Sequence, residues 1–194
     1  TVLDIPRYGC LNIHPSLLPQ YRGPSPVAAA VMHGDTFAGV SIMKLDAGMD
    51  SGPVFSQAQI PVMENDTTES LTPRLFAIGS MLLLETLINL PKGKTVPVPQ
   101  DHSAATFTQQ INKEDGLIDW QLSSVEICRK VRAYYPWPGA YTKWQGKQLK
   151  ITGCLPDAAE EKGEPGKVVA VHSSSKTAFG IIAGEGVLGV LSVQ

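Results

Sequence analysis

A proline-containing polar segment near the middle of the chain separates two parts with different patterns of apolar residues. Residues 93–112 include Pro97, Pro99 and many small polar side chains, which favour an extended linker. Before this segment, strand-like and helical patterns alternate. After it, short strand-like runs dominate. The pattern therefore predicts two domains, 1–92 and 113–194, joined by a linker over 93–112.

Length and composition are consistent with two small folded domains. The chain has 194 residues, of which 43% are hydrophobic and 18% charged, so it can bury a core. The net charge of -2 gives no global signal for nucleic acid or membrane, but a local patch stays open. The apolar run Met81 to Leu84 is too short to cross a bilayer. Three scattered cysteines without metal-ligand spacing predict reduced thiols.

The first part has the alternation of an α/β fold. Apolar runs predict strands over Cys10–Ile13, Gly39–Leu45 and Val54–Val62. Ser25-Pro26 is a typical helix start. A longer helix is predicted from Asp66 to about Leu90, with Asp66 and Glu69 at the spacing of a capping box.

The second part reads as one helix followed by short strands. The helix is predicted from Ser123 to about Tyr134. Five strand-like runs separated by glycines follow, which is typical of a small β-barrel. They cover residues 140–144, 148–154, 167–172, 176–182 and 186–193.

Two polar side chains interrupt the first strand. Asn12 and His14 alternate with Leu11 and Ile13, so they share one face of the strand, just before Pro15. Ligands of α/β sheets bind at such strand ends. Taken alone, such a pair is more often a polar strand end with a solvated histidine.

A glycine-containing loop follows the second strand. It carries Asp46 and Asp50 with Gly48 and Gly52. Aspartate and glycine together often only build a turn, and for Asp46 this stays an equal alternative.

The two segments together resemble the 10-formyltetrahydrofolate-dependent formyltransferases. The resemblance rests on Asn12-Ile13-His14-Pro15-Ser16-Leu17-Leu18-Pro19, on Tyr21-Arg22-Gly23, and on Leu45-Asp46-Ala47-Gly48-Met49-Asp50-Ser51-Gly52. It implies the C-terminal half of a Rossmann-like formyltransferase domain followed by a small OB-like β-barrel domain. The family's first strands are then expected upstream of Thr1.

The resemblance also implies roles for individual residues. Asn12 and His14 are expected to polarise the formyl oxygen, and Asp50 to position His14 and assist proton transfer. Ser16, Leu17, Leu18 and Pro19 are expected to contact 10-formyltetrahydrofolate. The chemistry agrees, because formyl transfer passes through a tetrahedral oxyanion that needs donors, and the attacking amine must lose a proton.

The second part favours one branch of the family. Its segments Asn112–Trp120 and Tyr134–Tyr141 are similar to those of enzymes that formylate initiator methionyl-tRNA. This implies a cytoplasmic bacterial or organellar-matrix enzyme that binds folate and tRNA as a monomer, without a metal or a membrane. The alternatives are transfer to a sugar-nucleotide amine and a non-catalytic RNA-binding module.

A basic segment supports a nucleic-acid partner. Six cations lie within 22 residues that contain no Asp or Glu, and aromatic residues are interleaved with them. Such a surface suits phosphate contact and stacking. A solvated helix face beside an aromatic core would give the same pattern. The predicted tRNA-binding residues are Arg129, Lys130, Arg132, Lys143, Lys147 and Lys150.

Overall fold

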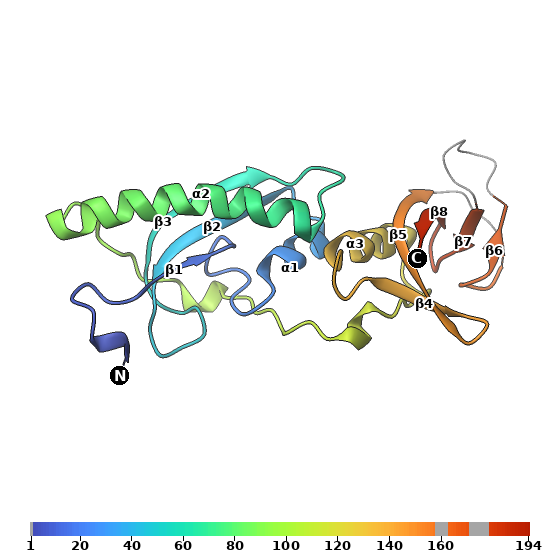
Figure 1. The fold of residues 1–194 in the computed structure, drawn as a ribbon, viewed down its shortest axis with the longest axis horizontal. Helices are drawn as coiled ribbons and strands as arrows, with labels where there is room; N and C mark the ends of the chain where they lie inside the picture. The colour runs from blue at the N-terminus through green and yellow to red at the C-terminus, as the bar shows by residue number, and fades with distance from the viewer. Residues whose placement is uncertain (1, 158–162, 171–178) are drawn as a thin grey trace. The chain divides into compact units, whose positions relative to one another are not determined.

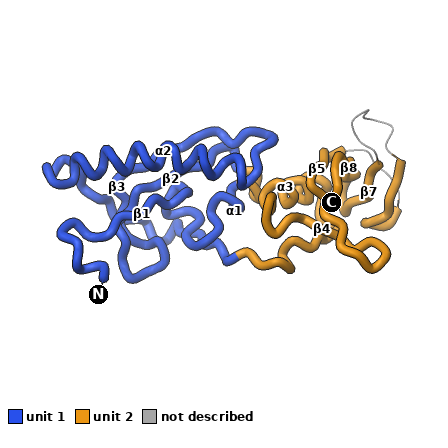
Figure 2. The backbone as a smooth tube through the Cα atoms, in the orientation of Figure 1, with its two compact units in different colours: residues 1–30, 35–110 blue, residues 31–34, 111–194 orange. Residues whose placement is uncertain are grey.

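The computed structural model describes residues 2–157, 163–170 and 179–194 (Figure 1). The chain forms two compact units (Figure 2). Unit 1 comprises residues 1–30 and 35–110, and unit 2 comprises residues 31–34 and 111–194.

Unit 1 contains a three-stranded antiparallel sheet. Its order is β1 (Leu11–His14), β2 (Phe37–Lys44) and β3 (Val54–Pro61). Helix α1 (Pro26–His33) begins at the predicted proline. The three predicted strands are confirmed, with ends that shift by one or two residues. β2 is the central strand, and its Val40 and Ile42 are fully buried.

Helix α2 (Thr68–Asn89) lies across one face of this sheet (Figure 1). The predicted helix is confirmed, but the predicted capping box at Asp66 and Glu69 is wrong. The cap is Thr67, whose hydroxyl accepts from the Ser70 amide at 3.1 Å, while the Ser70 hydroxyl accepts from the Thr67 amide at 3.0 Å. The helix begins one residue later than predicted, so Asp66 is left to accept from the Met63 amide and to pair with Arg74.

The stretch Thr68–Lys92 is, by length and composition alone, apolar enough to cross a membrane. Its inner face packs on the sheet, where Leu71 and Leu75 are fully buried. Gly79 allows the closest approach, because a Cβ there would lie 2.6 Å from Cγ2 of Ile13. The helix therefore serves unit 1 as a core helix, although its outer side exposes Met81 and Leu84.

The segment predicted as a linker is extended but lies along unit 1. Val98 exchanges two backbone hydrogen bonds with Val54, and Arg22 exchanges backbone bonds with Thr106 and Thr108. We call residues 98–108 the strap. Three short 3-10 helices occur nearby, η2 (Leu90–Lys92), η3 (His102–Ala104) and η4 (Lys113–Gly116), and a fourth, η1 (Val2–Asp4), lies near the start of the chain.

Unit 2 is a five-stranded antiparallel sheet packed against helix α3 (Ser124–Ala133). The strand order is β4 (Ala140–Trp144), β5 (Lys147–Asp157), β8 (Val187–Val193), β7 (Phe179–Ile182) and β6 (Val168–Val169). The predicted helix is confirmed, and Ser123 caps it in a box with Glu126. Parts of the predicted strands 167–172 and 176–182 lie outside the described residues. The core includes Ile127, Ile151 and Leu188.

Candidate active site

Strand β1 directs Asn12 and His14 to the sheet face opposite α2. Ile13, between them, contacts the helix side, where it faces Gly79. Alternation along the strand therefore places Asn12 and His14 together on the other face, opposite Met43 and Ser41 of β2. His14 is buried and Asn12 is half-buried.

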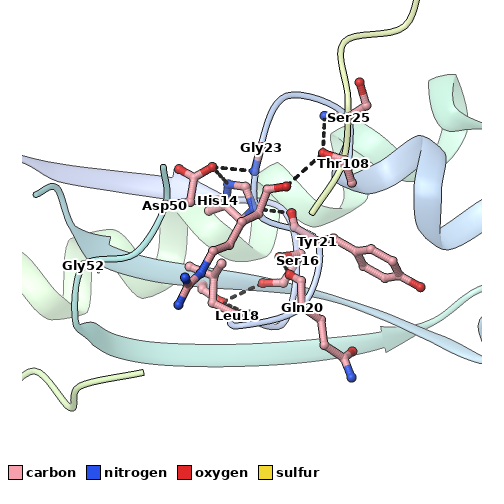
Figure 3. A network of polar contacts seen from close by, with 12 residues as sticks. His14, Ser16, Leu18, Gln20, Tyr21, Gly23, Ser25, Asp50, Gly52 and Thr108 are labelled. Atoms are coloured by element: carbon pink, nitrogen blue, oxygen red, sulfur yellow. Dashed lines mark hydrogen bonds and ion pairs between the residues drawn. The ribbon is translucent and has the colours of Figure 1, made fainter. Parts of the chain in front are cut away.

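Both ring nitrogens of His14 face protein oxygens (Figure 3). Nε2 lies 2.9 Å from the Tyr21 carbonyl oxygen, and Nδ1 lies 3.6 Å from Oδ2 of Asp50. A carbonyl only accepts, so Nε2 carries a hydrogen. Nδ1 of His14 and the Asp50 carboxylate lie within ion-pair distance of each other. The geometry thus suits a His14–Asp50 pair that can take up and release one proton.

Asp50 sits in an unusual backbone conformation. Its φ is 46°, in the left-handed region that residues with a side chain rarely adopt. Its Oδ2 also accepts from the Gly23 amide at 2.8 Å (Figure 3). Asp46, in the same loop, accepts from the Gly48 amide and the Ser51 hydroxyl. Asp46 therefore builds the turn, which was one of its two readings, while the Asp50 carboxylate faces His14.

The Asn12 amide is half-buried on the same strand face as His14. Among the residues that the structure describes, its side chain forms no hydrogen bond. A half-buried amide with free N–H donors, on the same strand face as the His14–Asp50 pair, can donate to a ligand oxygen.

The loop after β1 is held by its backbone. The Ser41 hydroxyl donates to the Ser16 carbonyl at 2.6 Å and accepts from the Leu18 amide at 3.1 Å. Gln57 donates to the Leu18 carbonyl at 2.9 Å. Ser16 and Leu18 are buried, whereas Leu17 and Pro19 are half-buried. Of the four residues predicted to contact folate, Leu17 and Pro19 thus keep the more accessible side chains.

Three consecutive residues join the loop to the pair. The Tyr21 carbonyl accepts from His14 and the Gly23 amide donates to Asp50. Between them, the buried Arg22 side chain donates to Oε1 of Gln100 from Nε at 3.1 Å and from Nη2 at 2.7 Å. Sequence reasoning missed both as site residues. Arg22 lies in the Tyr21-Arg22-Gly23 motif but was given no role, and Gln100 lies in the segment predicted as a linker.

Tyr21 marks the outer wall of the same loop. Its hydroxyl donates to Oδ2 of Asp35 at 2.8 Å. Burial raises the pKa of Tyr21 above its ordinary 10.0, and the hydrogen bond to Asp35 and that residue's charge add to the rise. The phenol therefore stays neutral at physiological pH. A shallow pocket beside it is lined by Ser16, Leu17 and Asp35.

The predicted tRNA-binding residues of unit 2 occupy different settings. Lys143 and Lys147 are exposed and Lys150 is half-exposed. Lys150 pairs with Tyr141, two residues before Lys143, so Lys143 and Lys150 share a sheet face. Lys147 pairs with Trp144 and points to the other face.

On α3, Arg129 and Arg132 are half-exposed, but Lys130 is engaged in the fold. Its Nζ donates to the Leu117 carbonyl at 2.6 Å and lies 5.7 Å from the centre of the Tyr134 ring. Burial lowers the pKa of Lys130 from its ordinary 10.5, against the opposing charges of Asp115 and Asp119. Lys130 is thus the least available of the six cations.

No group of three or more His, Cys, Asp or Glu side chains in the described part of the chain is placed to hold a metal ion. An amide donor, an imidazole and a carboxylate are instead gathered at one strand end. These groups are suited to stabilise an oxyanion and to move a proton during acyl transfer.

The chain belongs to the formyl transferase family. Residues 1–87 match the family described as formyl transferase, and residues 110–194 match the formyl transferase C-terminal domain. The α/β fold class with a following C-terminal domain, predicted from the sequence, is thereby confirmed.

Individual relatives agree with this assignment. The chain is 50% identical, over 168 residues, to the methionyl-tRNA formyltransferase of Chloroflexus aggregans, covering 87% of this chain and 54% of that protein. The chain therefore spans about half the length of the curated relatives it matches.

Two solved structures share the fold. HypX from Aquifex aeolicus, in complex with tetrahydrofolic acid, has a TM-score of 0.68 and 26% identity, over 94% of this chain and 31% of that one. An N-formyltransferase from Helicobacter canadensis, with folinic acid and dTDP-3-aminofucose, has a TM-score of 0.70 and 19% identity, over 94% and 66%.

Proposed function

We propose that the complete protein transfers the formyl group of 10-formyltetrahydrofolate to the amino group of initiator methionyl-tRNA. The observation that carries the proposal is the Asn12 amide, which has no hydrogen-bond partner among the described residues. It lies on the strand face that also presents the buried His14 and its partly buried partner Asp50. The 50% identity to a methionyl-tRNA formyltransferase supports this acceptor.

The reaction forms a bond between the acceptor nitrogen and the formyl carbon and breaks the bond from that carbon to N10 of the folate. Between these steps the formyl oxygen carries a negative charge. The Asn12 amide donates to this oxyanion. One such donor contributes roughly 10²–10³ in rate.

Proton balance assigns work to the His14–Asp50 pair. The acceptor amine loses one proton after attack, and N10 gains one as it leaves. The pair, with Nδ1 and Oδ2 at 3.6 Å, accepts the first proton and returns one to the leaving nitrogen, directly or through water. The Tyr21 carbonyl holds Nε2 at 2.9 Å and so fixes the ring orientation. His14 can polarise the formyl oxygen only if Nε2 leaves this carbonyl.

Residues Ser16 to Pro19 fit a folate wall. Their backbone is pinned by Ser41 and Gln57, while Leu17 and Pro19 keep apolar surface available. A pinned apolar loop suits the flat pterin ring, since such ligands bind in preformed, mostly apolar sites. The tetrahydrofolate complex of HypX supports a folate as the ligand, without bearing on which residues contact it.

The basic segment of unit 2 is the proposed tRNA surface. Lys143 is exposed, and Arg129, Arg132 and Lys150 are half-exposed, so these four charges can contribute to the attraction of phosphates. Lys147 on the opposite sheet face and the engaged Lys130 contribute less.

A sugar-nucleotide amine is the second candidate acceptor, because the fold is shared with an N-formyltransferase whose structure contains dTDP-3-aminofucose. The discriminating experiment offers the complete protein both acceptors with 10-formyltetrahydrofolate. We expect transfer to charged initiator tRNA at least about a hundredfold faster per enzyme, given that a site built for one acceptor rejects another by such factors. Faster transfer to the amino sugar would overturn the proposed acceptor.

We further propose that the protein works as a monomer in the bacterial cytoplasm or an organellar matrix. Light scattering of the complete protein, alone and with tRNA, tests the monomer. A mass of two protomers would contradict it.

A further inference from the structure

Asp50 is held in a conformation that its own sequence disfavours. An aspartate in the left-handed region is less stable than in the usual regions, and it persists where neighbouring groups fix it. The Gly23 amide fixes the carboxylate, but it does not fix the backbone of the loop.

The backbone of the loop is fixed by Gln100. Its Nε2 donates to the Asp50 carbonyl at 2.8 Å and to the Gly52 carbonyl at 2.6 Å. One side-chain amide thus bridges the residues on both sides of Ser51. Gln100 is buried, so these two donations are shielded from competing water.

Arg22 decides which way the Gln100 amide points. Nε and Nη2 of the guanidinium both donate to Oε1, which leaves Nε2 facing the two carbonyls. A flipped amide would set its NH₂ against guanidinium N–H groups and its oxygen against two carbonyl oxygens. Arg22 therefore orients Gln100, and Gln100 holds the loop.

We propose that Gln100, oriented by Arg22, is a positioning residue that sets the Asp50 carboxylate against His14. The proposal rests on the proposed function, and it makes the strap a working part of the active site rather than a linker. Other strap residues support this role by holding the segment that contacts the pair. The Thr106 hydroxyl accepts from the Tyr21 amide, the Thr106 carbonyl accepts from the Arg22 amide, and the amide and hydroxyl of Thr108 donate to the Arg22 carbonyl.

The test compares Gln100→Ala and Gln100→Glu in the complete protein. Gln100→Glu keeps the volume and the acceptors for Arg22, so the variant stays folded, but it loses the two donations. We expect either change to lower kcat about 10–100-fold with KM nearly unchanged, the usual size for supporting residues of a site. Gln109→Glu makes the same chemical change at an exposed position beyond the strap, and should leave kcat unaltered.

A double-variant cycle separates positioning from simple damage. In an Asp50→Asn background, each Gln100 change should lower kcat by less than about a further threefold, because the effects of coupled residues are not additive. Losses that multiply in full, or Gln100 variants with wild-type kcat, would overturn the positioning role. Wild-type kcat for Asp50→Asn would overturn the role of Asp50 as well.

A crystal structure of the Gln100→Glu variant gives a readout without activity. We expect Asp50 to leave its φ near 46° and Oδ2 to move away from Nδ1 of His14. An unchanged loop would overturn the positioning role even if the complete protein proved to use another acceptor. Absence of any formyl transfer by the wild type, with the loop displaced in the variant, would instead overturn the proposed function alone.

Discussion

The site of unit 1 and the basic surface of unit 2 use polar side chains in opposite ways. In unit 1, His14, Arg22 and Gln100 are buried. The His14 ring bonds to the Tyr21 carbonyl, and the Arg22 guanidinium bonds to the Gln100 side chain. In unit 2, Lys143 and Lys147 are exposed and Lys150 is half-exposed on the paired strands β4 and β5. Chemistry on a formyl group needs fixed donors, whereas attraction of phosphates needs accessible charge. Substitutions in the site of unit 1 should therefore lower kcat strongly. Substitutions of the lysines in unit 2 should lower tRNA affinity only slightly, with effects that nearly add.

The largest effect is expected at the carboxylate of the pair. Asp50→Asn keeps the shape but removes the partner that holds the proton with His14, so kcat should fall about 10²–10⁴-fold. Asp46→Asn is the matched control, since Asp46 is exposed and only builds the turn. Steady-state formyl transfer measures both. An equal fall in kcat for the two variants would mean that the loop structure, and not the His14–Asp50 pair, is required for transfer.

Another carboxylate of unit 1, the buried Asp66, should affect stability rather than catalysis. Asp66 accepts from the Met63 amide and the Ser70 hydroxyl and pairs with Arg74. Burial alone would raise the pKa of Asp66, but these partners lower it below its ordinary 3.8. Asp66→Asn should lower the free energy of unfolding by about 1–3 kcal/mol at pH 7 and leave kcat intact.

The sign of this pH dependence follows from the lowered pKa of Asp66. Its stabilisation is complete above the ordinary value of 3.8 and is lost as the pH falls through the lower folded value. The difference between wild type and Asp66→Asn in urea unfolding should thus shrink below about pH 4. A difference that grew toward low pH would contradict the assignment.

Smaller effects are expected on the paired strands β4 and β5 of unit 2. Lys143→Gln with Lys150→Gln removes two charges from one sheet face, so tRNA affinity should fall several-fold and the salt slope should drop by about 2. Lys147→Gln on the other face is the control, and it should change the tRNA affinity and the salt slope less. Titrations at several salt concentrations check this, and a dominant effect of Lys147 would place the RNA on the opposite face.

The smallest effect on tRNA is expected at Lys130. Its ammonium already donates to the Leu117 carbonyl and is half-buried. Lys130→Met should leave the salt slope unaltered and reduce stability by about 1 kcal/mol, the size of one hydrogen bond. A salt slope reduced as much as by Lys143→Gln would show that the Lys130 charge reaches phosphate.

The features that follow from local residue patterns or from a motif could be predicted from the sequence. Strand alternation placed Asn12 and His14 on one face, and the spacing of Leu71 and Leu75 predicted α2. The predicted range of the helix after Ser123 is confirmed as α3, whereas the predicted capping box at Asp66 failed because the N-cap of α2 is Thr67, one residue later.

The contacts of Gln100 with Arg22 and with the Asp50 loop could not be predicted in this way. Gln100 contacts Arg22, 78 residues earlier, and the Asp50 loop, 50 residues earlier, and nothing local to Pro99 and Gln100 signals these partners. Prolines and small polar residues correctly indicated an extended chain. They carried no information on what that chain lies against, which depends on long-range pairing with Val54 and Arg22.

The most direct test of the account is single-turnover formyl transfer by the complete protein and its Asn12→Ala variant, with tRNA binding measured in parallel. We predict a rate lower by roughly 10²–10³ in the variant, because one oxyanion donor is lost, with methionyl-tRNA affinity within about twofold of wild type. A variant that transfers the formyl group at the wild-type rate would contradict the role of the Asn12 amide and, with it, the active site described in unit 1.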